Sequence, residues 1–86
     1  MKMFILKNCL HCKRAQAWIT KLKNENPMYQ NIEIELIDEQ INSEVANQYD
    51  YYYVPALFDD NVKLHEGVAS EEKIRKIFDE YLKNDI

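Results

Sequence analysis

The sequence predicts one α/β domain with the element order βαβαββα. Three observations carry this prediction. A short apolar run at residues 3–6 ends just before two cysteines, Cys9 and Cys12. Apolar residues recur at helical spacing after the cysteines and again near the C-terminus, and two apolar runs between them are joined by a polar turn. With 86 residues, 47% of them hydrophobic, the chain can bury one core, so we assign residues 1–86 to a single domain.

The first half of the chain is expected to alternate strand and helix. Residues 3–6 are too few for a helix and rich in Phe and Ile, which favours a buried strand. The next segment has the periodicity of an amphipathic helix up to a break at 24–27, and its first turn holds the cysteines; its apolar residues are Ala15, Trp18, Ile19 and Leu22. A second strand with one wet face, at a sheet edge, is then predicted by the alternation of Ile32, Ile34 and Leu36 with polar residues.

The second half is expected to hold a short helix, a hairpin and a final helix. The short helix rests on a spacing of four, with caps at Asn42 and Ser43; its apolar residues are Ile41, Val45 and Tyr49. The hairpin joins residues 54–58 to 62–64 through a polar turn at 59–61. After Gly67 and a cap at Ser70, the last helix carries an apolar stripe of Ile74, Ile77, Phe78, Tyr81 and Leu82.

Composition excludes several classes of partner. Fifteen acidic against eleven basic residues give a formal charge of −4, which offers no general attraction to nucleic acid or anionic lipid. The apolar residues at the N-terminus are too few for a signal peptide or a membrane span. We therefore expect a cytoplasmic protein with no nucleic-acid or membrane partner. In that compartment a structural disulfide would be reduced, so the cysteine pair indicates redox or metal chemistry.

The Cys9-Leu10-His11-Cys12 motif is the candidate catalytic site. A spacing of three lets the two sulfurs meet across the first helical turn, and the free N–H groups and dipole of that turn favour a thiolate on the first cysteine. Cys9 is therefore the expected nucleophile, and Cys12, one turn inside the helix, the expected resolving thiol. Positive charge around Cys9 should stabilise its thiolate further, with Lys7 and His11 as the main tuning residues beside Lys13 and Arg14.

Two other readings of the cysteines remain open. Free cysteines are often simply buried and packed, although a strand that ends directly before such a motif favours redox chemistry. A tetrahedral zinc site needs four ligands, while the chain has two cysteines and two histidines, so no metal site is expected within one chain. A cluster shared by two chains stays an alternative.

On these residues the chain resembles glutaredoxins and small thioredoxins over nearly its whole length. The resemblance consists of a strand, Cys9-x-x-Cys12, a helix, a strand, a helix and then Val54-Pro55 at the start of a hairpin. It implies a thioredoxin fold, with a four-stranded mixed sheet flanked by three helices. It also implies that Pro55 is cis and faces the cysteines, and that the Val54 backbone receives an extended substrate. Tyr53, directly before Val54, is a further candidate for the substrate groove.

The resemblance has gaps where glutathione would bind. Lys7 matches the basic residue that helps glutaredoxins hold a glutathione carboxylate. However, the family's glycine pair falls on His65-Glu66, and the acidic residue after it falls near Val68 or Ala69. Half of the glutathione cradle is therefore absent, and weak glutathione binding is expected. The tail from Gly67 is closer to thioredoxin, but thioredoxin's buried aspartate would fall on Met3.

Taken together, these residues predict a monomeric thiol-disulfide oxidoreductase without a bound cofactor. Its expected partners are disulfide-containing proteins or glutathione, the latter as a candidate co-substrate, and an unidentified reductase that recycles Cys9 and Cys12. Two alternatives belong to other classes. One is an iron-sulfur or metal-binding module of glutaredoxin type, and the other is a redox-inert interaction domain of the same fold.

Overall fold

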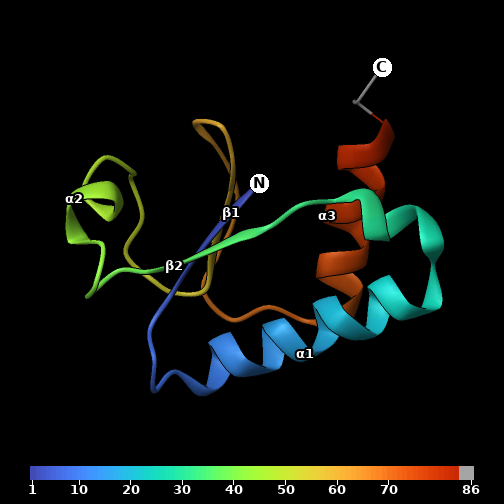
Figure 1. Cartoon of the computed structure of the whole chain (residues 1–86), viewed down its shortest axis with the longest axis horizontal. Helices are drawn as coiled ribbons and strands as arrows, with labels where there is room; N and C mark the ends of the chain where they lie inside the picture. Colours follow the sequence, from blue (N-terminus) through green and yellow to red (C-terminus); the bar gives the residue numbers. More distant parts are fainter. Residues whose placement is uncertain (84–86) are drawn as a thin grey trace.

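A four-stranded mixed sheet forms the centre of the chain in a computed structural model that describes residues 1–83 (Figure 1). The strands are β1 (Lys2–Ile5), β2 (Glu35–Asp38), β3 (Ala56–Asp59) and β4 (Val62–Glu66), and their order across the sheet is β2-β1-β3-β4. Strand β2 pairs with β1 in parallel, whereas the β1–β3 and β3–β4 pairs are antiparallel. The prediction of a four-stranded mixed sheet is confirmed.

Three α-helices accompany the sheet, as predicted. They are α1 (Leu10–Glu25), α2 (Ser43–Ala46) and α3 (Glu71–Lys83). A short 3-10 helix, η1 (Pro27–Asn31), lies between α1 and β2, in a region where the sequence predicted only a break. Asn26 caps it by accepting the N–H of Met28, and Pro27 occupies its first turn, where a missing N–H costs nothing.

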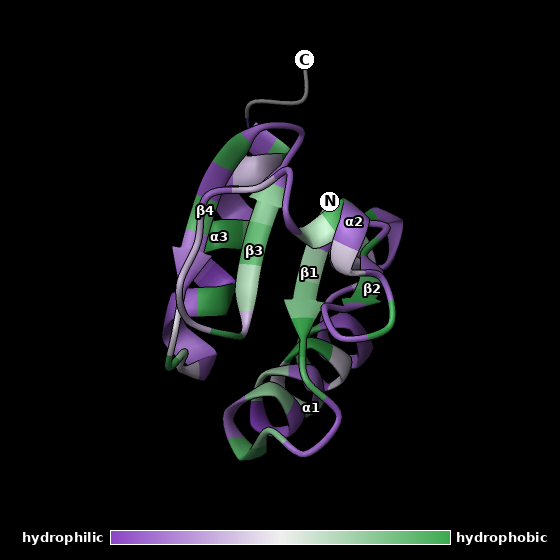
Figure 2. Ribbon diagram, turned by 90° about the vertical axis from the view of Figure 1, so that its left-hand side faces the viewer, coloured by the Kyte–Doolittle hydropathy of each residue, from purple (hydrophilic) through white to green (hydrophobic). Residues whose placement is uncertain are grey.

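The sheet is covered on both faces, because alternate residues of a strand point to opposite sides. Met3 and Leu57 belong to one core cluster with the apolar stripes of α1 and α3, which include Ala15, Ile19, Leu22, Ile74, Ile77 and Phe78. Phe4 and Ala56 belong to a second cluster with Ile37, Ala46 and Phe58. Figure 1 shows α2 well apart from α1 and α3, and Figure 2 shows apolar colouring along β1 and β3.

The position of the second strand was predicted wrongly. Strand β2 begins at Glu35, whereas Ile32 directly follows η1 and is buried in the cluster under α1 and α3. Parallel pairing places Ile37 beside Phe4 on the opposite face, and Leu36 is 49% exposed. Of the three apolar residues in the predicted alternation, Leu36 alone lies in β2, and its side chain is exposed. The predicted position of the strand at the edge of the sheet is confirmed. The predicted solvent-exposed face is not, because Ile37, which lies on that face, is buried.

The short helix α2 begins later than its apolar spacing suggested. Ile41 is 78% exposed and lies outside the helix. The carboxylate of Asp38 accepts the N–H groups of Gln40 and Ile41, and this turn after β2 leaves Ile41 in solvent. Asn42 occupies the N-cap position without a side-chain hydrogen bond, so its predicted capping contact is absent there. Val45 and Tyr49 do pack against the core.

The hairpin and the last helix agree with the prediction, with shifted bounds. Strand β3 begins at Ala56, and its pairing of Asp59 with Val62 leaves Asp60 and Asn61 as the loop. Gly67 has a φ of +86°, which glycine adopts without strain, and its N–H donates to the Pro55 carbonyl at 3.0 Å. Ser70 caps α3 by accepting the N–H of Lys73 at 3.1 Å. Within residues 1–83, no helix is long and apolar enough to cross a membrane.

Candidate active site

One end of the sheet collects the candidate residues. The parallel strands β1 and β2 finish side by side there, with Ile5 beside Asp38, and the antiparallel strand β3 starts there, with Ala56 beside Phe4. The segment that leaves β1 leads to Cys9, the residue after β2 is Glu39, and the residue before β3 is Pro55. The topology therefore brings three distant parts of the sequence to one end of the sheet.

Cys9 and Cys12 occupy two different positions of helix α1. Cys9 is the N-cap, and its sulfur accepts the backbone N–H of Cys12 at 3.1 Å. Cys9 is partly exposed, whereas Cys12 is fully buried, with 0% exposure. The first N–H groups of a helix lack intrahelical acceptors and carry the positive end of the dipole, so they stabilise negative charge on the Cys9 sulfur. Both cysteines are free thiols in this structure.

The Cys12 thiol is held in its protonated form. Burial, followed by a hydrogen bond with the Cys9 side chain, raises the pKa of Cys12 from 9.0 to about 12. The negative charges of Cys9 and Glu39 raise this pKa further, while a backbone hydrogen bond from Leu6 opposes the shift. The two thiols are therefore chemically unlike: Cys9 is partly accessible from solvent, and Cys12 is buried and protonated.

The Val54–Pro55 peptide bond is cis, as the resemblance implied. Pro55 is buried, Val54 is half-buried against the second core cluster, and Tyr53 is 70% exposed. The segment before Pro55 is fixed by Glu66 at the end of β4, whose Oε2 accepts the N–H groups of Tyr52 at 2.6 Å and Tyr53 at 3.0 Å. Glu66 therefore positions the backbone just before Pro55.

Lys7 and Cys9 line one cavity of about 220 Å³, together with Leu6, Asn8 and Gln40. This places the predicted tuning residue Lys7 beside the predicted nucleophile. His11 is exposed on the first turn of α1, two residues after Cys9. Tyr53, Val54 and Pro55 reach the same end of the sheet through β3, but they are not among the residues that line this cavity.

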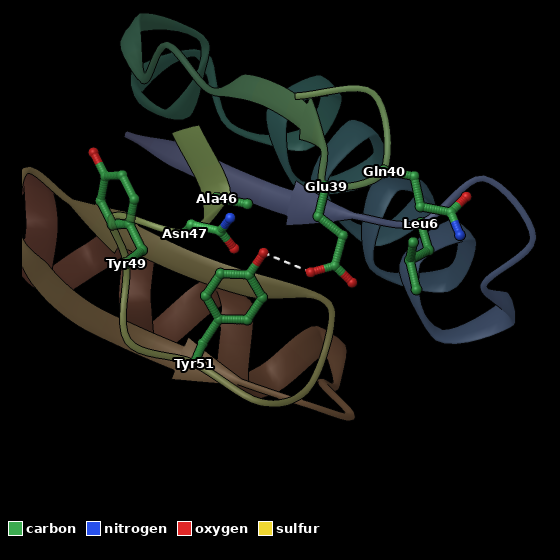
Figure 3. Close-up of a pocket in the computed structure, with 7 residues that line it drawn as sticks. All are labelled: Leu6, Glu39, Gln40, Ala46, Asn47, Tyr49 and Tyr51. Atoms are coloured by element: carbon green, nitrogen blue, oxygen red, sulfur yellow. Dashed lines mark hydrogen bonds between the residues drawn. The ribbon is translucent and has the colours of Figure 1, made fainter. Parts of the chain in front are cut away.

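The four tyrosines between α2 and Pro55 divide into two pairs. Tyr49 and Tyr51 pack on Phe4, with ring centroids 4.8 and 5.0 Å from it. Tyr52, at 86% exposed, and Tyr53 point into solvent. Tyr51 also donates its hydroxyl to Glu39 at 2.7 Å, and burial together with this hydrogen bond raises the pKa of Tyr51 (Figure 3).

Glu39 and Glu66 are the site residues that sequence reasoning missed. Glu39 directly follows Asp38, the last residue of β2. An acidic residue at the end of a strand could have marked it as a candidate, but the bounds of this strand were predicted wrongly. The Glu39 carboxylate lies close enough to disfavour the Cys12 thiolate. Glu66 was considered only as a departure from the glutathione pattern, and its contact with the Tyr52 and Tyr53 backbone depends on a register that the sequence does not reveal.

His65 and Glu66 are both engaged in contacts within the chain. His65 donates from Nε2 to the Gly67 carbonyl at 3.0 Å, and Glu66 forms an ion pair with Lys63 at 2.7 Å in addition to its backbone contacts. The Lys63 partner and the backbone donors lower the pKa of Glu66 to about 2.

No group of three or more histidine, cysteine or acidic side chains within residues 1–83 is arranged to hold a metal ion. No family model matches the chain, and no curated protein matches it. A solved structure described as "Structure of a malarial protein" is similar in fold, with a TM-score of 0.71 and 18% sequence identity. The match covers 94% of this chain and 93% of that one, and at this identity it supports the small α/β fold alone.

Proposed function

We propose that the chain has a thioredoxin fold and acts as a thiol-disulfide oxidoreductase, with Cys9 as the nucleophile and Cys12 as the resolving thiol. The observation that carries the proposal is the contrast between the two cysteines. Cys9 is a partly exposed N-cap that accepts a backbone N–H, whereas Cys12 is fully buried with a raised pKa. The sheet order, the cis Val54–Pro55 bond and the position of Pro55 beside the end of β1 support the fold assignment.

The proposed reaction is two successive thiol-disulfide exchanges. The Cys9 thiolate attacks one sulfur of a substrate disulfide, so that a Cys9–substrate bond forms and the other substrate sulfur leaves as a thiol after taking up a proton. Cys12 then loses its proton and attacks the Cys9 sulfur, which releases the second substrate thiol and forms the Cys9–Cys12 disulfide. Two electrons pass to the substrate, and a dithiol reductase or two glutathione molecules then supply two further electrons, which reduce the Cys9–Cys12 disulfide while the reductant is oxidised to its own disulfide.

The raised pKa of Cys12 supports an order in which attack by Cys9 precedes resolution by Cys12. A buried, protonated thiol does not compete with Cys9 for the incoming disulfide, because only the thiolate is nucleophilic. When the Cys9 sulfur is joined to the substrate, it no longer carries the negative charge that raises the Cys12 pKa. Formation of the mixed disulfide therefore eases ionisation of Cys12, and resolution follows attack.

The roles of the cysteines are tested with Cys9→Ser and Cys12→Ser chains and a small neutral disulfide, bis(2-hydroxyethyl) disulfide. We expect the Cys12→Ser chain to gain one mercaptoethanol adduct that persists, and the Cys9→Ser chain to gain none, as measured by mass spectrometry of the intact protein. Circular dichroism of both variants serves as the folding control. Adducts on the Cys9→Ser chain alone would reverse the assignment, and an unreactive wild type would favour an interaction domain without redox activity.

The alternative, an iron-sulfur module, would differ from the proposed enzyme in colour, metal content and oligomeric state. Such a cluster would need ligands from two chains, because one chain offers only the two cysteines of this site. Metal analysis and the visible spectrum of protein purified without oxygen test it directly. Under the proposed function the protein is colourless, monomeric and active toward disulfides in the reducing cytosol.

A further inference from the structure

A second cavity adjoins the one that contains Cys9. Its volume is about 410 Å³, and its lining includes Leu6, Glu39, Gln40, Tyr49 and Tyr51 (Figure 3). Leu6 and Gln40 also line the Cys9 cavity, so the two spaces meet at these side chains. A molecule whose sulfur lies at Cys9 can therefore extend past Leu6 and Gln40 toward Glu39.

The charge in this second cavity is negative. Glu39 is the acidic residue among the lining side chains, and the other polar groups are amides and tyrosine hydroxyls. One oxygen of Glu39, Oε2, accepts the Tyr51 hydroxyl at 2.7 Å, which orients the carboxylate. Among residues 1–83, no lysine, arginine or histidine forms an ion pair with Glu39. An oriented, half-buried carboxylate without a cationic partner is suited to receive a cation from a ligand.

We propose that this cavity binds the ammonium or guanidinium group of a disulfide substrate, and that Glu39 thereby selects cationic disulfides for attack by Cys9. The inference rests on the proposed function and specifies its substrate class. The two cavities then carry opposite charges, with Lys7 beside Cys9 and Glu39 farther along. A substrate with a positively charged end fits this polarity better than an anionic one.

A positive charge on the substrate beside Glu39 would also affect the second step of the exchange, in which Cys12 attacks the Cys9 sulfur. The carboxylate disfavours the Cys12 thiolate, as the raised pKa of Cys12 shows. A cation paired with Glu39 offsets that negative charge. The same group that places the substrate therefore favours ionisation of Cys12 once the mixed disulfide has formed.

The test compares three disulfides with one skeleton: cystamine, bis(2-hydroxyethyl) disulfide and 3,3′-dithiodipropionate, which carry ammonium, hydroxyl and carboxylate ends. The rate of mixed-disulfide formation is measured by mass spectrometry for the Cys12→Ser chain with Glu39 or with Glu39→Gln. A Glu33→Gln variant, which removes an exposed carboxylate outside the cavity, is the control for net charge. We expect Glu39→Gln to lower the cystamine-to-hydroxyethyl rate ratio by about fivefold, the upper range for a partly exposed ion pair, and Glu33→Gln to leave it unchanged.

A second measurement needs neither a reaction nor a variant. 1,6-Diaminohexane has the length and charges of cystamine but no disulfide, and its titration into the wild type is followed by NMR. We expect amide shifts at Glu39, Asn47 and Tyr51, weakened by salt. An unchanged rate ratio in Glu39→Gln, or diamine shifts that avoid these residues, overturns the inference and leaves the proposed function intact. If the neutral disulfide does not react at all, the proposed function fails, while the diamine titration still decides whether the cavity binds a cation.

Discussion

The most direct consequence of the two cysteine environments is a difference in alkylation. The perturbation is Cys9→Ser, which leaves Cys12 as the one thiol of the chain. In the wild type the pKa of Cys12 rises from 9.0 to about 12, which corresponds to about a thousandfold less thiolate at neutral pH. Part of this shift comes from Cys9 itself and is lost in the variant, but burial, the largest cause, remains. We therefore expect Cys12 to react between about 10 and about 1000 times more slowly than an ordinary thiol.

The assay is alkylation by iodoacetamide, followed by mass spectrometry at a series of pH values. The same chain in concentrated guanidinium chloride is the internal reference, because unfolding removes burial and returns Cys12 to ordinary thiol behaviour. The pH series separates ionisation from simple inaccessibility. A buried thiol with a raised pKa continues to react faster as the pH increases above about 10, where the unfolded reference levels off because its thiol is then almost fully ionised. A folded chain whose rate levels off together with the reference would refute the reasoning.

Three further predictions concern the surroundings of the site and the hydrophobic core. Glu66→Ala removes the carboxylate that accepts the Tyr52 and Tyr53 N–H groups, and faster amide exchange at both residues is expected. In the wild type this anchor is present above pH 4.5 and lost as the pH falls toward 2, because the folded-state pKa of Glu66 is lowered from 4.5 to about 2; exchange measured against pH checks this. His11→Ala should lower the reduction potential of the cysteine pair, because it removes a side chain that can carry positive charge near the Cys9 thiolate; about 30 mV would mean a tenfold change in equilibrium constant, and equal potentials would make His11 a bystander. Phe78→Ala empties a fully buried position against Tyr29 and should cost about 3–5 kcal/mol of unfolding free energy in denaturant titrations; a loss below about 1 kcal/mol would contradict the assigned core.

The elements that sequence reasoning placed well are those with local signals. The long apolar stripe of α3 and the start of α1 at the cysteine motif depend on residues within one or two helical turns, where spacing decides the structure, although Cys9 proves to be the N-cap rather than a residue of the first turn. The hairpin followed from its polar turn in the same way. These predictions needed no knowledge of distant parts of the chain.

The errors came from positions that depend on tertiary pairing. Ile32 and Ile34 alternate with polar residues and are packed against the core, yet they precede β2, whose bounds are set by pairing with β1. Ile41 has helical spacing to Val45 but is turned into solvent by the Asp38 turn. Glu39 was overlooked for the same reason, since its relation to Cys12 arises only when two parallel strands end together. Alternating or helically spaced apolar residues indicate which side chains share one face of an element, but they do not indicate which other element packs against that face.

The roles proposed for the two cysteines follow from their positions in the helix rather than from the residues between them. The N-cap side chain lies outside the first turn and accepts a free N–H group, whereas the side chain three residues later lies inside that turn and is fully buried. Leu10 and His11 both point to solvent, so changing them alters the charge near Cys9 without altering which sulfur is buried. Such substitutions can therefore change the rate or the reduction potential, but an exchange of the two roles would require helix α1 to begin at a different residue.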